Sequence, residues 1–327
     1  MANPEILREG AAAPMTRIFG WATLGCLLAF MINNVLTVGW DYPGAMKALS
    51  GGGTGAIIQL SIYLVCILAA VLFVLRTPYR ALRWDAMKIT NFNAYLVRAF
   101  FFTVLFVGIV DVIISFMRVE NLLENFFEDE IVRGLGRAKY VGINVHIPLM
   151  VLGFIVAFFS RTLGFTWLAL LIVAAELAIV LSRFIFSYEQ ALMGDLVRYW
   201  YAALFLFASA YTLIEEGHVR VDVFYAGFGA TKKGFVNAVG TILLGMTTAW
   251  VIIAIGFAGK QSIINSPVKN FEVSQTGGTG MFIKYQMAAF IGIFAITMLI
   301  QFVSYLFEAV ADKRGEQGRR EVGPVAH

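Results

Sequence analysis

Residues 56–75, AIIQLSIYLVCILAAVLFVL, form an apolar stretch without a single charged side chain. A helix rises about 1.5 Å per residue, so about 20 apolar residues cross a hydrocarbon layer that is about 30 Å thick. The stretch therefore predicts a membrane-spanning helix at about residues 56–76. Seven further blocks predict the same, at residues 18–38, 94–117, 141–160, 164–186, 197–215, 235–257 and 283–308. We expect an all-α integral membrane protein with about eight transmembrane helices.

The composition agrees with this class and excludes others. Of the 327 residues, 59% are hydrophobic and 14% are charged, and the mean hydropathy is +0.77. A soluble domain has about 45–50% apolar and about 25% charged residues. Long apolar blocks, in place of short alternating ones, exclude an outer-membrane β-barrel. The first block, Ile18 to Trp40, is longer than the apolar core of a signal peptide, so we expect a retained helix.

The positive charge of the chain predicts its orientation in the lipid bilayer. The formal net charge is +4. The basic residues lie mostly in short loops between the apolar blocks, so no nucleic-acid partner is expected. Eight spans place both termini on one side of the membrane. If that side is the cytoplasm, fifteen Lys and Arg residues lie inside and ten outside, which predicts an N-in, C-in topology in an inner-type membrane.

One loop on the predicted outer side has the pattern of a surface helix. In residues 119–131, VENLLENFFEDEI, apolar side chains recur at helical spacing and carboxylates lie between them. We expect an amphipathic helix that lies along the membrane surface. Its acidic face either receives a soluble partner or is merely solvated.

The motifs of pumps, membrane cytochromes and hydrolases are missing. Residues 227–233 lack the spacing of a phosphate-binding loop. His146 and His218 are expected at opposite membrane faces and His327 is terminal, so the three histidines do not suit a shared haem. The sequence also lacks a zinc-ligand spacing and a GxSxG elbow. We therefore predict no catalytic residue, no cofactor and no metal.

Charged side chains within the predicted spans are candidate functional residues. A lone charge at the centre of a bilayer costs about 2.5–3.5 kcal/mol on insertion scales. Asp111 lies deep in the third block, and the fifth block contains Glu176 and Arg183. Glu176 has three possible roles: a proton relay, an ion pair with Arg183, or a contact with another subunit. Among the uncharged polar residues, Asn33, Asn34 and Gln59 suit hydrogen bonds between helices.

The most informative segment follows the sixth block. An apolar span ends in Glu215-Glu216-Gly217-His218-Val219-Arg220-Val221-Asp222. With Glu189 in the preceding loop and Trp200 early in the span, this segment resembles the small membrane subunit of tripartite ATP-independent periplasmic (TRAP) transporters, the DctQ family. The resemblance covers roughly residues 164–310. It marks the following residues as a family motif and a candidate subunit interface: Glu189, Trp200, Glu215, His218, Arg220 and Asp222.

The charges of this motif leave two roles open. Arg220 has a fork geometry that suits a carboxylate, and Glu215, Glu216 and Asp222 lie close to it in sequence. The motif either forms an ion-pair cluster that fixes the turn into the seventh span or contacts a larger subunit directly.

The resemblance also implies a set of partners. In that family the small subunit is a non-catalytic scaffold that packs against a large DctM-type membrane subunit. The large subunit carries the substrate and sodium sites, and a periplasmic binding protein delivers a small organic acid anion. An independent transporter or channel that uses Glu176 and Asp111 is the alternative, and a membrane anchor for a redox enzyme is a third reading.

The chain is longer than the family pattern. We expect three segments: an N-terminal extension of about four helices at residues 1–163, the DctQ-like region at 164–310, and a cytoplasmic tail at 311–327. The extension would enlarge the scaffold, contact the binding protein through residues 119–131, or mediate oligomerisation.

Overall fold

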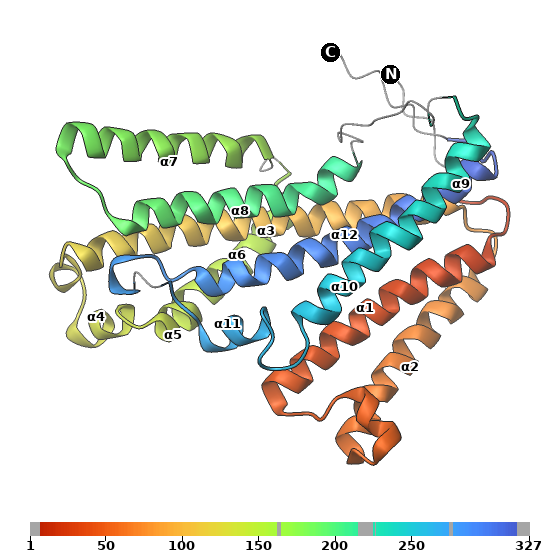
Figure 1. The fold of residues 1–327 in the computed structure, drawn as a ribbon, viewed down its shortest axis with the longest axis horizontal. Helices are drawn as coiled ribbons and strands as arrows, with labels where there is room; N and C mark the ends of the chain where they lie inside the picture. Colours follow the sequence, from red (N-terminus) through yellow and green to blue (C-terminus); the bar gives the residue numbers. More distant parts are fainter. Residues whose placement is uncertain (1–6, 162–164, 215–224, 226, 275–276, 319–327) are drawn as a thin grey trace. The chain divides into compact units, whose positions relative to one another are not determined.

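The structure is a computed structural model that describes residues 7–161, 165–214, 225, 227–274 and 277–318. All regular elements in these ranges are helices (Figure 1). The α-helices are α1 (Pro14–Trp40), α2 (Gly53–Arg76), α3 (Leu82–Val119), α4 (Asp129–Leu135), α5 (Ala138–Val141), α6 (Ile147–Phe159), α7 (Phe165–Phe186), α8 (Ala191–Ile214), α9 (Ala230–Gly240), α10 (Thr247–Gly256), α11 (Asn265–Asn270) and α12 (Lys284–Lys313). Short 3₁₀ turns are η1 (Ala45–Ser50), η2 (Leu123–Asn125) and η5 (Gly277–Thr279). The π-helical turns η3 (Gly142–His146) and η4 (Thr241–Met246) lie within longer helices.

Eight helical segments are long and apolar enough to cross a membrane, which confirms the predicted number; two of them join consecutive elements, α5, η3 and α6 in one and α9, η4 and α10 in the other. They are Pro14–Trp40, Gly53–Arg76, Leu82–Val119, Ala138–Phe159, Thr166–Phe186, Ala191–Leu213, Ala230–Gly256 and Lys284–Lys313. Helices suit this environment because every backbone polar group must find its partner inside the protein when no water is present. The predicted all-α membrane class is therefore confirmed, and the orientation of the termini stays a prediction.

The prediction of a surface helix over residues 119–131 is wrong, because the chain is not helical throughout this segment. Helix α3 ends at Val119, and Asn121 adopts the left-handed conformation with φ 55°. The amide of Leu122 bonds to the Met117 carbonyl at 2.8 Å, as in a Schellman motif. Only the short turn η2 and then α4 follow. Leu123 is buried in a small apolar cluster with Phe282, so this segment packs onto the protein.

The described contacts divide the chain into two compact units. Unit 1 comprises residues 1–93, 212–260 and 295–327, and unit 2 comprises residues 94–211 and 261–294. Each unit combines segments from both sides of residue 163. The predicted boundary at residues 163/164 therefore stays a proposal about family resemblance, and the compact units are not divided there.

In unit 1, α1 and α2 form an antiparallel pair of helices (Figure 1). Predicted hydrogen bonds between spans are present: Asn33 Nδ2 donates to the Gln59 carbonyl at 2.9 Å, and Gln59 Nε2 donates to Thr37 Oγ1 at 2.9 Å. At the other end of α1, the buried Arg17 pairs with Asp85 at 2.8 Å. These paired polar groups fix the register of the helices, because an unpaired polar group in an apolar interior is costly.

The end of α12 is also held within unit 1 by an arginine. The guanidinium of Arg83, at the start of α3, pairs with Glu308 and Asp312 of α12. Its Nε donates to the Gln317 carbonyl at 3.0 Å. The side chain of Arg83 therefore connects α3 to three residues near the end of the described chain: Glu308, Asp312 and Gln317.

Unit 2 has an aromatic core between helices distant in sequence. The ring of Phe207 in α8 lies 5.7 Å from that of Phe101 in α3 and 4.9 Å from that of Phe290 in α12. Gly153 of α6 lies directly against Thr103, where a Cβ atom would come within 2.7 Å of the Thr103 amide nitrogen. Close approach of small residues is a common basis of helix packing in membranes. Helix α3 thus contacts α6 and α8 of this unit.

Candidate functional site

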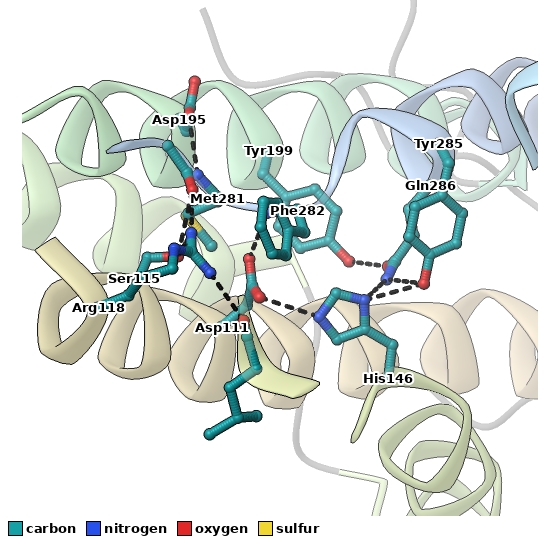
Figure 2. A network of polar contacts seen from close by, with 12 residues as sticks. Asp111, Ser115, Arg118, His146, Asp195, Tyr199, Met281, Phe282, Tyr285 and Gln286 are labelled. Atoms are coloured by element: carbon teal, nitrogen blue, oxygen red, sulfur yellow. Dashed lines mark hydrogen bonds and ion pairs between the residues drawn. The ribbon is translucent and has the colours of Figure 1, made fainter. Parts of the chain in front are cut away.

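A buried polar network lies in unit 2, with His146 at its centre (Figure 2). The π-helical turn η3 ends at His146, and a π-turn changes the direction of side chains relative to a regular helix. His146 Nε2 lies 3.1 Å from Asp111 Oδ1 of α3. His146 Nδ1 lies 2.9 Å from the Tyr285 hydroxyl and 3.1 Å from Gln286 Nε2 of α12. Three helices therefore meet at one imidazole ring.

The hydrogen bonds of this network can be given a consistent set of directions. Tyr199 of α8 donates to Gln286 Oε1, and Gln286 Nε2 donates to the Tyr285 hydroxyl at 3.1 Å. Tyr285 can then donate to Nδ1 of His146, while Nε2–H donates to the Asp111 carboxylate. An imidazole with its proton on Nε2 makes the bonds to Tyr285 and Asp111, and the single lone pair of its Nδ1 is then used by Tyr285 in place of Gln286. The histidine thus joins the helices through both of its ring nitrogens.

The second oxygen of Asp111 holds the chain just before α12. Asp111 Oδ2 accepts the backbone N–H of Phe282 at 2.8 Å. Asp195 of α8 accepts the preceding N–H, that of Met281, at 3.1 Å. Two carboxylates on two different helices therefore bind two successive amides, which leaves little freedom to this segment of backbone.

Arg118 completes the site (Figure 2). It lies about two helical turns after Asp111 on α3. Its guanidinium donates to the Gly278 carbonyl at 2.9 Å, to the Gly280 carbonyl, and to the Leu135 carbonyl at 3.3 Å. It also lies 4.0 Å from the centre of the Phe282 ring. Arg118 interacts electrostatically with Asp111 as well, so it offsets part of the negative charge of the buried carboxylate.

The predicted residue Trp200 links α8 to α3. The indole Nε1 donates to the Val104 carbonyl at 3.2 Å, and the ring lies against Gly108. A Cβ atom at Gly108 would lie 2.5 Å from Trp200 Nε1, so this position requires glycine or a shift of the ring. In this structure Trp200 is an internal packing residue, and it is buried.

The ion pair between Glu176 and Arg183, one of the three roles left open for Glu176, is absent from the described structure. Arg183 instead pairs with Glu189 at 3.4 Å, and both side chains are largely exposed. Glu176 is exposed on α7. The other predicted motif residues, Glu215, His218, Arg220 and Asp222, lie outside the described residues.

The loop after α7 contacts the end of α3. The Tyr188 hydroxyl donates to Glu120 at 2.6 Å, and its ring lies 6.5 Å from that of Phe116. Burial and the bond to Glu120 raise the pKa of Tyr188 to about 12. The phenol therefore stays neutral at physiological pH and acts as a donor.

Sequence reasoning placed His146 at the start of the fourth span and did not connect it with Asp111. Tyr199, Tyr285, Gln286 and Asp195 were also missed. The available signal was the presence of polar side chains within apolar blocks, since each of these needs a partner when buried. Nothing in the local sequence says which partner it finds.

The polar network joins helices of unit 2 to one another through hydrogen bonds. The described residues contain no group of three His, Cys, Asp or Glu side chains that could hold a metal ion. A hollow of about 550 Å³ in the same unit is apolar and contains none of the network residues; it is lined by Tyr95, Met150, Val151, Phe154, Ile155, Phe158 and Phe159. The polar groups of the network therefore bind one another.

Comparison with known protein families gives a match to part of the chain. Residues 169–311 match the family described as tripartite ATP-independent periplasmic transporters, DctQ component. The match confirms the predicted resemblance and nearly coincides with its predicted limits. No curated protein and no solved structure matches the chain.

Proposed function

We propose, from the DctQ-type region at residues 169–311, that this chain is the small membrane subunit of a TRAP transporter. The single observation that carries the proposal is this match, which covers the last four of the eight candidate spans. The protein would be a non-catalytic scaffold in a bacterial inner membrane, with both termini in the cytoplasm. It would pack against a large DctM-type subunit, which receives substrate from a periplasmic binding protein.

The transported substrate of the complex would be a small organic acid anion, taken up together with sodium ions. These properties belong to the large subunit on this proposal. The geometry of the present chain supports such a division, because Asp111, its most deeply buried candidate carboxylate, has both oxygens engaged with His146 and Phe282. The Asp111 carboxylate therefore binds groups of its own chain.

The alternative is an independent transporter or channel that uses Glu176 and Asp111. It predicts that Glu176→Gln abolishes flux while the protein stays folded. The contacts of Asp111 give this alternative no support, since a carboxylate on a transport path must exchange its partners during the cycle.

Purification from the native membrane tests the proposal. The tagged chain is extracted in mild detergent, and the masses of co-purifying proteins are measured. A stoichiometric, larger and very hydrophobic partner is expected. Purification of the chain alone, as a stable oligomer, would count against it.

Uptake measurements in liposomes provide the second test. Liposomes that contain only this chain should not take up a panel of labelled mono- and dicarboxylates. Sodium-dependent uptake should require the large subunit and the binding protein. Strong sodium-dependent uptake by this chain alone would refute the scaffold role.

A further inference from the structure

Helix α7 is the least buried of the eight candidate spans. Only 6% of its most apolar window is buried, against 44% for α3 and for α8 and 50% for α12. Leu168 is its one fully buried side chain among those described. In Figure 1, α7 lies at the edge of unit 2, with α8 beside it. Most of its surface is therefore available to lipid or to another protein.

Glu176 lies near the middle of this exposed helix. Among the described residues it has neither a hydrogen bond nor an ion pair. The cation nearest to it along α7, Arg183, is engaged with Glu189. Acyl chains cover apolar side chains well but offer nothing to a carboxylate, and ionisable residues inside membranes normally pair with one another.

The surroundings of Glu176 on its helix are apolar. Val173 and Val180, three residues before and four residues after it, share its side of the helix and are 64% and 48% exposed. A carboxylate between two exposed valines forms a polar contact point within an apolar surface. This pattern suits a protein interface that lies inside the membrane.

In a second copy of this chain, the arginines of α3, α7 and α8 are already engaged within their own chain. Each arginine of α3, α7 and α8 already contacts a carboxylate or a carbonyl oxygen in its own chain. These residues are Arg83, Arg98, Arg118, Arg183 and Arg198. An arginine or lysine of the large membrane subunit would supply the missing positive charge in the proposed complex.

We propose that the surface formed by Val173, Glu176 and Val180 docks onto the large membrane subunit, and that Glu176 pairs there with an arginine or lysine side chain of that subunit. This inference rests on the function proposed above. It assigns to α7, the first helix of the DctQ-type region, the role of a charged contact point within the bilayer. This contact would then belong to the DctQ-type region and not to the four spans that precede it in the sequence.

Photo-cross-linking in the full-length chain tests the contact directly. The photoreactive amino acid p-benzoylphenylalanine is placed at Val173, and at Leu68 of α2 as a control on another exposed helix. The chain is expressed in its native host and irradiated in the intact membrane. Position 173 should cross-link to the large subunit, and position 68 should not.

Substitution of Glu176 tests the charge. We expect Glu176→Leu to reduce the amount of co-purified large subunit by about tenfold or more, and Glu176→Gln to have a smaller effect because an amide can still accept a hydrogen bond. Glu124→Leu is the matched control, since Glu124 is another exposed carboxylate but lies outside the spans. The thermal stability of the isolated Glu176→Leu chain should be unchanged or higher, because Glu176 has no partner there.

The outcomes separate the two proposals. If the wild-type chain brings down no large subunit, the proposed function fails. If the wild-type chain does bring it down, the present inference is overturned by any of three results: full binding by Glu176→Leu, a cross-link from position 173 to lipid or to a second copy only, or a lower melting temperature of the isolated variant.

Discussion

At the scale of single residues, His146 shows how one imidazole can hold three membrane helices together. It contacts Asp111 on α3 and both Tyr285 and Gln286 on α12 from its own position at the end of η3. All of these groups are buried. The contribution of such a network is best judged by what is left unpaired when one member is removed.

We expect His146→Phe to destabilise the protein by about 1–3 kcal/mol, because Asp111 Oδ1 and Tyr285 would each lose a partner in an apolar interior. The melting temperature in detergent, measured by the fluorescence of the intrinsic tryptophans, should fall by several degrees. Tyr285→Phe removes one hydroxyl and should lower it less. An unchanged melting temperature of His146→Phe would show that the network contributes nothing to stability.

Gly108 and Trp200 give a second prediction at this scale. A side chain at Gly108 would collide with the Trp200 indole, so Gly108→Val should cost about 1–3 kcal/mol by overpacking. Trp200→Ala creates space at the same place and should also destabilise. The double variant should be more stable than the sum of the two single effects predicts.

A thermal melt of the four proteins in this cycle measures the coupling. Strict additivity would mean that the two residues do not contact each other in the membrane. The cycle also distinguishes a packing role of Trp200 from a contact with another subunit, because a purely intersubunit residue would not couple to Gly108 in the isolated chain.

At the scale of helices, hydropathy predicts the number and approximate position of the spans because the bilayer fixes the required length. It fails at the start of α3, which was predicted at residue 94 and begins at Leu82. The additional turns at the start of the helix contain Arg83, Asp85 and Lys88. Because these residues are charged, the apolar block in the hydropathy profile begins only after them. Asp85 pairs with Arg17 and Arg83 with Glu308, and partners so distant in sequence cannot be read from a local pattern.

The segment after α3 was predicted wrongly for a different reason. Periodicity continues beyond Val119, but Asn121 turns the backbone into the left-handed region and closes the helix. An apolar period says which side chains would share a face if the helix continued, and it does not say whether the helix continues. Asparagine is one of the few residues that suit this position.

Asn121 therefore carries a prediction about helix termination. Asn121→Gly should leave stability nearly unchanged, since glycine adopts a positive φ without steric cost. Asn121→Val should destabilise by about 1–2 kcal/mol, because a β-branched residue is strained in this conformation. The melting temperatures of both variants and of the wild type decide this. Equal stability of the glycine and valine variants would exclude the left-handed end of α3.

At the scale of the whole molecule, the DctQ-type region does not form a unit by itself. Unit 2 joins residues 94–160 with α7, α8 and the start of α12. Trp200 needs the Val104 carbonyl, and the amide of Phe282 needs Asp111. The match to residues 169–311 could be anticipated from the motif, but this dependence on the N-terminal helices could not, since family resemblance says nothing about residues outside it.

We therefore expect residues 164–327 to fail as an independent protein. Without α3, the buried Trp200 indole and the Phe282 amide lose their acceptors, and the aromatic surface around Phe207 becomes exposed. Expressed alone, the fragment should aggregate in detergent. Coexpressed with residues 1–163 as a separate chain, it should form a monodisperse complex whose cooperative melt lies near that of the intact protein, because the contacts within unit 2 do not require a continuous backbone at this point. A monodisperse 164–327 fragment that unfolds cooperatively on its own would show instead that the N-terminal spans are an attachment to a self-sufficient four-helix scaffold.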